Sequence, residues 1–157
     1  MKIFIIILIL LTCIKLNAQN DQNVRKQEAL VTIGFLQGGG SLIGFDIEGL
    51  ITKRIGLQAG CGLLGYGCAV TYHLKKDDIK SPAIAMNYWH QGLWGSYVQG
   101  LVGPTFVYRA WNILSLQLGF GKLVDKGPKY DEQIDGEHQI VLTFRVGIFI
   151  KAGNKKK

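Results

Sequence analysis

The stretch at residues 139–150, QIVLTFRVGIFI, alternates strictly between two kinds of position. Counted from Ile140, every second residue is Ile, Leu, Phe or Val, whereas the positions between them hold Gln, Val, Thr, Arg, Gly and Phe. A period of two is that of a β-strand, whose successive side chains point to opposite faces. The stretch therefore predicts a strand with one apolar face and one mixed face.

Similar runs follow one another from Ala29 onward, and no helical period persists for two turns. The predicted strands are residues 29–37, 41–51, 55–64, 66–74, 82–91, 96–109, 113–123 and 138–150. Most of these runs match the length of about 9–11 residues that a tilted transmembrane strand needs. We predict an all-β fold, an eight-stranded antiparallel up-and-down transmembrane β-barrel over residues 29–150, with both termini at one end.

The direction in which each face points separates two kinds of barrel, because a soluble barrel turns its apolar face inward and a membrane barrel turns it outward. The mixed faces carry four charged residues, Asp46, Glu48, Arg109 and Arg145. Burying an unpaired charge in an apolar core costs several kcal/mol, so we predict that these four form a charge network in a polar lumen. Within it we expect an ion pair between Asp46 and Arg145, with the charged groups closer than about 6 Å.

The two ends of the chain have their own character. Residues 1–18 have the shape of a signal peptide, with a basic start, an apolar run and Ala18 before the expected cut at Gln19. The rival interpretation, a lipoprotein signal ending at Cys13, is disfavoured by Thr12. We further expect an N-terminal periplasmic segment at residues 19–28 and a basic tail at residues 151–157.

The formal net charge of +7 comes mainly from these ends. The leader and the tail together hold six of the 18 Lys and Arg residues, which leaves twelve basic against eleven acidic residues in the body. A nearly neutral body gives no support to nucleic-acid binding, so no nucleic-acid partner is expected.

The strand count, the alternating turns and the apolar stripes resemble the small eight-stranded outer-membrane barrel proteins of Gram-negative bacteria. The segments GCAVTYHL (67–74), YWHQG (88–92) and GPTFVYR (103–109) look like parts of uncharacterised barrels from the Bacteroidota. This resemblance implies a place in the cell outer membrane, with outer-membrane lipid and the barrel assembly machinery as partners. The chain departs from the pattern after Phe149, because eight residues follow where such barrels commonly end on an aromatic.

The sequence contains few candidate catalytic or metal-binding residues. The three histidines, His73, His90 and His138, lie on different predicted strands without a carboxylate at ligand or triad spacing, so we expect no catalytic activity, no metal site and no cofactor. The one candidate nucleophile pair is His90 with Ser96 across a short loop, and no orienting acid is evident nearby.

The loop at residues 124–137 is acidic but lacks the spacing of a calcium site, so we expect a solvated loop that is the only sizeable site for a surface partner. Cys61 and Cys68 are predicted opposite each other on the outer face, where a disulfide and two free thiols both remain open.

A proline and the positions of the aromatic residues allow two further predictions. Pro104 inside a strand predicts a bulge or bend, because proline cannot donate to the ladder. The aromatic residues predict interfacial belts, with one group near each end of the barrel. These groups are Tyr88, Trp89, Trp94 and Tyr97 at one end, and Tyr72, Tyr108 and Trp111 at the other.

The leading functional hypothesis is an outer-membrane β-barrel protein with a structural or surface-interaction role and no catalytic activity. One alternative is a secreted soluble β-barrel that binds a small apolar ligand. The other is a lipid-modifying outer-membrane enzyme.

Overall fold

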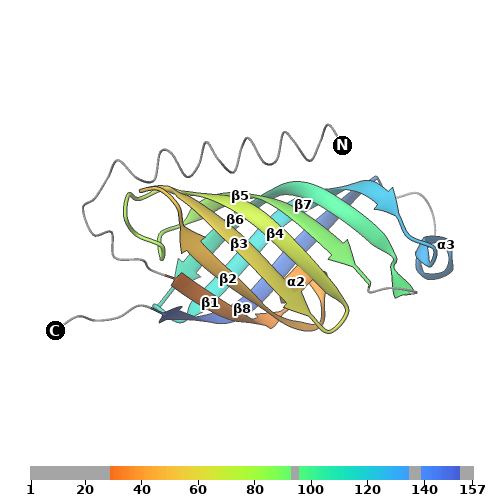
Figure 1. Ribbon diagram of the computed structural model, residues 1–157, viewed down its shortest axis with the longest axis horizontal. Helices are drawn as coiled ribbons and strands as arrows, with labels where there is room; N and C mark the ends of the chain where they lie inside the picture. Colours follow the sequence, from red (N-terminus) through yellow and green to blue (C-terminus); the bar gives the residue numbers. More distant parts are fainter. Residues whose placement is uncertain (1–28, 93–95, 135–138, 153–157) are drawn as a thin grey trace, which may run out of the picture.

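The computed structural model describes residues 29–92, 96–134 and 139–152, in which eight antiparallel strands close into a barrel (Figure 1). The strands are β1 (Ala29–Phe35), β2 (Ile43–Leu50), β3 (Ile55–Gly62), β4 (Gly65–His73), β5 (Ala83–Gln91), β6 (Gln99–Ala110), β7 (Leu114–Lys126) and β8 (Ile140–Ala152). Each strand pairs with the next, and β8 pairs with β1. The predicted fold class, an eight-stranded antiparallel up-and-down β-barrel, is confirmed.

The two ends of the barrel carry different connections. The β2–β3, β4–β5 and β6–β7 connections share one end with the start of β1 and the finish of β8, and we call this the terminal end (Figure 1). The other four connections lie at the opposite end, which we call the loop end. Two short helices interrupt the loop-end connections, α2 (Gln37–Gly40) and α3 (Tyr130–Gln133). None of the helices in the described ranges is long and apolar enough to cross a membrane.

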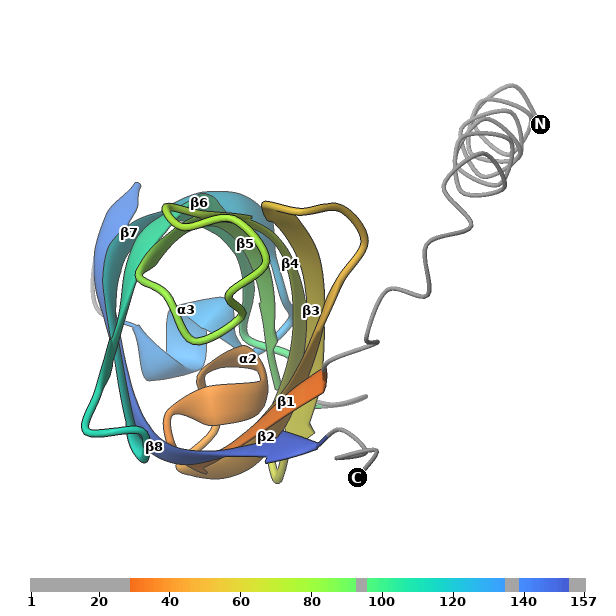
Figure 2. The same ribbon diagram turned by 90° about the vertical axis from the view of Figure 1, so that its left-hand side faces the viewer.

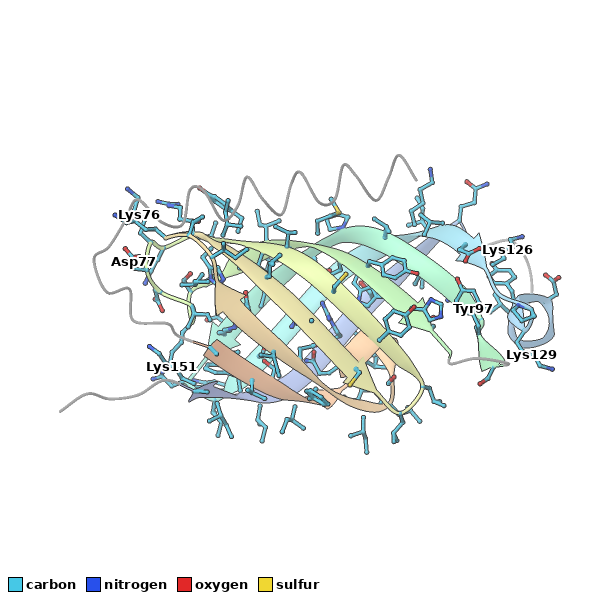
Figure 3. All side chains as sticks on the ribbon, viewed as in Figure 1. Lys76, Asp77, Tyr97, Lys126, Lys129 and Lys151 are labelled. Atoms are coloured by element: carbon cyan, nitrogen blue, oxygen red, sulfur yellow. The ribbon has the colours of Figure 1, made fainter. Side chains whose placement is uncertain are left out.

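The apolar side chains face outward and the polar ones face the axis. In β7 and β8, Leu116 and Phe144 are 38% and 50% exposed, whereas their chain neighbours Gln117 and Arg145 are 3% and 5% exposed. Figure 3 shows side chains projecting outward all along the barrel. The sidedness expected from the alternation is therefore present, and it is the reverse of an ordinary soluble barrel.

Two strands extend two or more residues beyond the runs predicted from the sequence. β7 continues to Lys126, and β8 continues to Ala152, where Lys151 and Ala152 pair with the first residues of β1. Residues 151–152, predicted as the start of the tail, and residues 124–126, predicted as loop, therefore belong to strands. Backbone pairing decides these limits, because a ladder partner satisfies N–H and C=O groups whatever the side chain is.

The bulge in β6 lies elsewhere than predicted. The register with β7 shifts between Gly100 and Leu101, whereas Val102 and Thr105 on either side of Pro104 keep one register. Pro104 pairs with Met86 on β5, so the strand passes through proline without a shift.

The prediction that the two cysteines lie opposite each other is wrong. The β3–β4 connection pairs Gly62 with Gly65, which sets Cys61 opposite Tyr66 and Cys68 opposite Ala59. Both thiols are free and exposed. The length of the connection fixes the register, and the centre of the turn lies one residue earlier than an opposition of Cys61 and Cys68 would require.

Several expectations lie outside the described residues. These are the signal peptide at residues 1–18, the periplasmic segment at residues 19–28, the belt position of Trp94, the strand position of His138 and the tail beyond Ala152.

Candidate functional site

The β1–β2 connection folds into the barrel at the loop end, where α2 lies inside the ring of strands (Figure 2). Gln37, Gly38 and Gly39 are buried there. A Cβ on Gly38 would lie 2.1 Å from the carbonyl carbon of Cys61, and one on Gly39 would lie 2.4 Å from the nitrogen of Tyr66. Both glycines also have positive φ, so glycine is what allows α2 to press against β3 and β4.

The first ion pair of the lumen lies beside α2. Nη1 of Arg145 is 3.6 Å from Oδ2 of Asp46, and Nη2 donates a hydrogen bond to Oδ1 of Asn87 at 2.8 Å. The other carboxylate oxygen of Asp46 accepts a hydrogen bond from the backbone N–H of Gly38 at 3.3 Å. The contact between Asp46 and Arg145 expected from the sequence is present, and it also holds α2.

Trp89 belongs to this interior cluster and not to an interfacial belt. It is 2% exposed, and the guanidinium of Arg145 lies 5.6 Å from the centroid of its ring. The parity of β5 explains the correction, because Trp89 shares the inward face with Asn87 and Ala85. Trp89, Asn87 and Arg145 are all at most 5% exposed, so side chains occupy the lumen at this depth.

The second ion pair lies near the terminal end. Nη2 of Arg109 donates to Oε2 of Glu48, and the two side chains are each 2% exposed. The other oxygen of Glu48 lies 2.9 Å from Nε2 of His73 and accepts a hydrogen bond of 2.5 Å from the hydroxyl of Thr71. The guanidinium of Arg109 and the hydrogen-bonding groups of Thr71 and His73 thus surround the buried carboxylate of Glu48, as a stable buried charge requires.

This second pair also holds a connection. The β4–β5 connection crosses the barrel opening at the terminal end (Figure 2), and Ile79 within it is fully buried against Leu30 and Phe149. Nη1 of Arg109 donates to the carbonyl oxygens of Ile79 at 2.6 Å and of Ser81 at 3.4 Å. Each ion pair therefore fastens one inward-folded connection, one at each end of the barrel.

The interior near the terminal end contains a serine, a histidine and a carboxylate arranged like a nucleophile, a base and an acid, namely Ser81, His73 and Glu48. The hydroxyl of Ser81 lies 3.4 Å from Nδ1 of His73, whose other nitrogen faces Glu48. Ser81 is only 2% exposed, so a substrate has no approach to its oxygen, and Arg109 already neutralises Glu48. The geometry is that of an anchored hydrogen-bond network.

No carboxylate stands at ligand or triad spacing from His73 in the sequence, but the fold brings Glu48 into contact with it. Glu48 and His73 lie on β2 and β4, which are separated by β3, so their contact passes over the inner face of β3. The alternation along each strand could have indicated this contact, since Glu48, His73 and Arg109 all lie on inward faces near the terminal end. No group of three or more His, Cys, Asp or Glu side chains in the described ranges could hold a metal ion.

His90 lies on the outer face near the loop end. Its ring stacks between Tyr66 and Tyr97, with centroid distances of 4.5 and 4.1 Å, and its Nδ1 lies 3.2 Å from the hydroxyl of Tyr88. These contacts cover both ring faces and one nitrogen, which does not favour the nucleophile pair with Ser96.

The stack on His90 ends in a carboxylate. The hydroxyl of Tyr97 donates to Asp125 at 2.8 Å. Burial, followed by this hydrogen bond, raises the pKa of the Tyr97 hydroxyl above its ordinary value, so Tyr97 stays a donor at neutral pH.

Comparisons with protein-family models, with curated proteins and with solved structures find no match to this chain. The fold and the site define the class of structure: a closed eight-stranded barrel with an apolar outside, a charged interior and an inward-folded connection at each end.

Replacing Gly39 with alanine is expected to release α2 from the lumen. A side chain at φ +84° costs about 1–3 kcal/mol, and the contact with the backbone of Tyr66 adds to that cost. Limited proteolysis should cut the connection between β1 and β2 faster in the variant. The matched control is Gly49→Ala, where nothing lies within 4 Å of the added methyl group. Equal cleavage of the two variants would contradict the seated position of α2.

Proposed function

We propose that this chain is an outer-membrane β-barrel protein with a structural or surface-interaction role and no catalytic activity. The observation that carries the proposal is an apolar outer surface on all eight strands. One well-exposed example from each strand, in order, is Ile33, Ile47, Leu57, Val70, Ile84, Phe106, Leu118 and Phe144. Soluble monomers rarely expose contiguous apolar surface on this scale, whereas a membrane barrel requires it.

The terminal end adds support from its amphipathic side chains. Tyr72, Tyr108 and Trp111 are exposed there, as a belt at a membrane boundary would be. Arg54 donates to the hydroxyl of Tyr72 at 3.2 Å and to the carbonyl of Leu74 at 3.1 Å, which brings a guanidinium to the edge of the apolar surface. In the proposed orientation this end faces the periplasm.

The filled interior argues against a channel and leaves the loop end as the place for a partner. The β5–β6 and β7–β8 connections are joined there, since the N–H groups of Gly127 and Lys129 donate to the carbonyls of Val98 and Tyr97 at 2.7 and 3.2 Å. Nζ of Lys126 lies 4.9 Å from the ring centroid of Tyr130. A surface partner would meet this joined pair of connections (Figure 3).

The test is expression of the full chain in a Gram-negative host, followed by fractionation and electrophoresis with and without boiling. We expect recovery in the outer-membrane fraction, extraction only by detergent, and a shift of the folded band on boiling. Recovery in the soluble fraction without detergent would overturn the proposal in favour of a secreted barrel that binds a small apolar ligand.

A further inference from the structure

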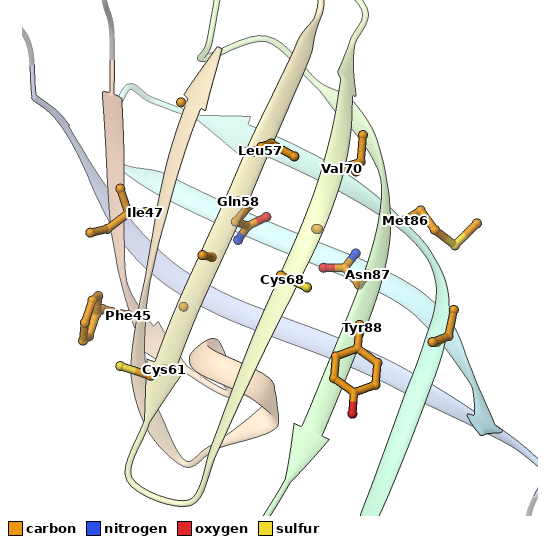
Figure 4. A pocket seen from close by; sticks show the side chains of 15 residues that line it. Phe45, Ile47, Leu57, Gln58, Cys61, Cys68, Val70, Met86, Asn87 and Tyr88 are labelled. Carbon is orange, nitrogen blue, oxygen red and sulfur yellow. The ribbon is translucent and has the colours of Figure 1, made fainter. Parts of the chain in front are cut away.

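A groove of about 840 Å³ runs over the outer surface from β2 to β6 (Figure 4). Its floor consists of small outward residues, namely Ala59 and Cys68, which pair with each other in the middle of β3 and β4, and Cys61 near the loop end of β3. Ile47 on β2 and Met86 on β5 rise on either side and are about half exposed. The groove is therefore a consequence of sequence, because small residues occupy outward positions between strands that carry large ones.

The loop-end side of the groove is polar. Tyr88 lines the groove opposite Cys68, and Figure 4 shows its hydroxyl pointing along β5 towards the loop end. That hydroxyl lies 3.2 Å from Nδ1 of His90, and the stack continues through Tyr97 to the carboxylate of Asp125. Of these groups only the hydroxyl of Tyr88 lies on the groove itself, and the imidazole and the carboxylate continue from it.

This arrangement limits what can occupy the groove. None of the described side chains that line it is charged, and its outward walls are alkyl, thioether, thiol and aromatic groups. A peptide would bring backbone N–H and C=O groups to a surface with few partners for them. A second copy related by a two-fold axis would set hollow against hollow and leave a cavity between the copies.

A flexible alkyl chain fits the apolar part of the groove, and a polar head joined to that chain fits the polar side at the loop end. We propose that the groove binds one acyl chain of a membrane phospholipid whose head group lies beside Tyr88 and His90. The acyl chain fills the hollow over Ala59 and Cys68, and the hydroxyl of Tyr88 meets the glycerol ester oxygens, which are uncharged and so are not repelled by Asp125. This inference rests on the proposed membrane location and adds a specific lipid site to it.

The test uses the full chain in phosphatidylcholine vesicles with a trace of phosphatidylcholine that carries a diazirine in one acyl chain. After illumination, mass spectrometry compares the labelling of residues 55–73 with that of the outward residues of β7 and β8. We expect about fivefold more label in the groove, the ratio that a preference of about 1 kcal/mol gives.

Filling the floor supplies the matched comparison. Ala59→Phe, and independently Cys68→Leu, should lower the groove labelling to that of β7 and β8. Ile33→Phe, which enlarges an outward side chain on β1, should leave the groove labelling unchanged. The boiling-dependent shift of the band shows that each variant has folded.

The remaining outcomes overturn one proposal or both. Equal labelling all around the barrel would overturn the groove site and support the membrane location. Chain-to-chain disulfides through Cys61 or Cys68 on mild oxidation, lost in Ala59→Phe, would show that a second copy covers the groove instead. Absence of label from every outward residue, with the protein outside the vesicles, would overturn the proposed function together with this site.

Discussion

Replacing Arg109 with methionine is expected to lower the free energy of unfolding by about 3–5 kcal/mol, the usual cost of leaving one partner of a buried ion pair alone. Glu48 would keep His73 and Thr71 but lose its cationic partner in a site that is 1% exposed. The β4–β5 connection would also lose its bond from Arg109 to the carbonyl of Ile79. Urea unfolding of the barrel in vesicles, followed by tryptophan fluorescence, measures the loss.

Two controls separate burial of charge from loss of packing. The double variant Glu48→Gln with Arg109→Met should recover most of the stability, because a neutral amide still accepts hydrogen bonds from Thr71 and His73. Arg54→Met removes an exposed arginine and should cost less than about 1 kcal/mol. A single variant no less stable than the double variant would contradict the proposed pairing.

Replacing Leu118 with arginine is expected to lower stability in a bilayer by about 2–4 kcal/mol, as charges near the midplane of lipid-facing strands do. Leu118 is 58% exposed and pairs with Phe106 and Phe144 on the neighbouring strands, so the guanidinium would enter apolar surroundings. The measurement is again urea unfolding in vesicles.

Val124→Arg on the same strand is the matched control. Val124 is 55% exposed and lies towards the loop end, where a charge reaches the interface and costs about 0–1 kcal/mol. In a soluble barrel the same two substitutions would give another pattern, because a substitution at an exposed position changes the free energy of unfolding by only about 0.5 kcal/mol. Equal small effects at the two positions would therefore contradict the proposed membrane location.

The sequence predicted the sidedness and one ion pair for the same reason. Alternation is a local property, so Arg145 must face away from Phe144 in any regular strand, and an interior that contains Arg145 needs an acid. Asp46 was found because β1 alone separates β2 from β8 in the barrel order. The contact of Glu48 with His73 also spans a single intervening strand, β3, but it was not predicted because the depth of the two residues along their strands, as well as parity, decides it.

The number of strands, their alternation and the side on which the apolar stripes lie followed from the sequence by itself, because a period of two depends only on the geometry of an extended backbone. The tertiary structure alone decided that α2 and the β4–β5 connection turn inward. A loop enters the lumen only when the closed ring leaves space of the right shape and offers partners for its backbone groups. Asp46 and Arg109 provide those partners, and their positions relative to the loops exist only after the barrel has closed.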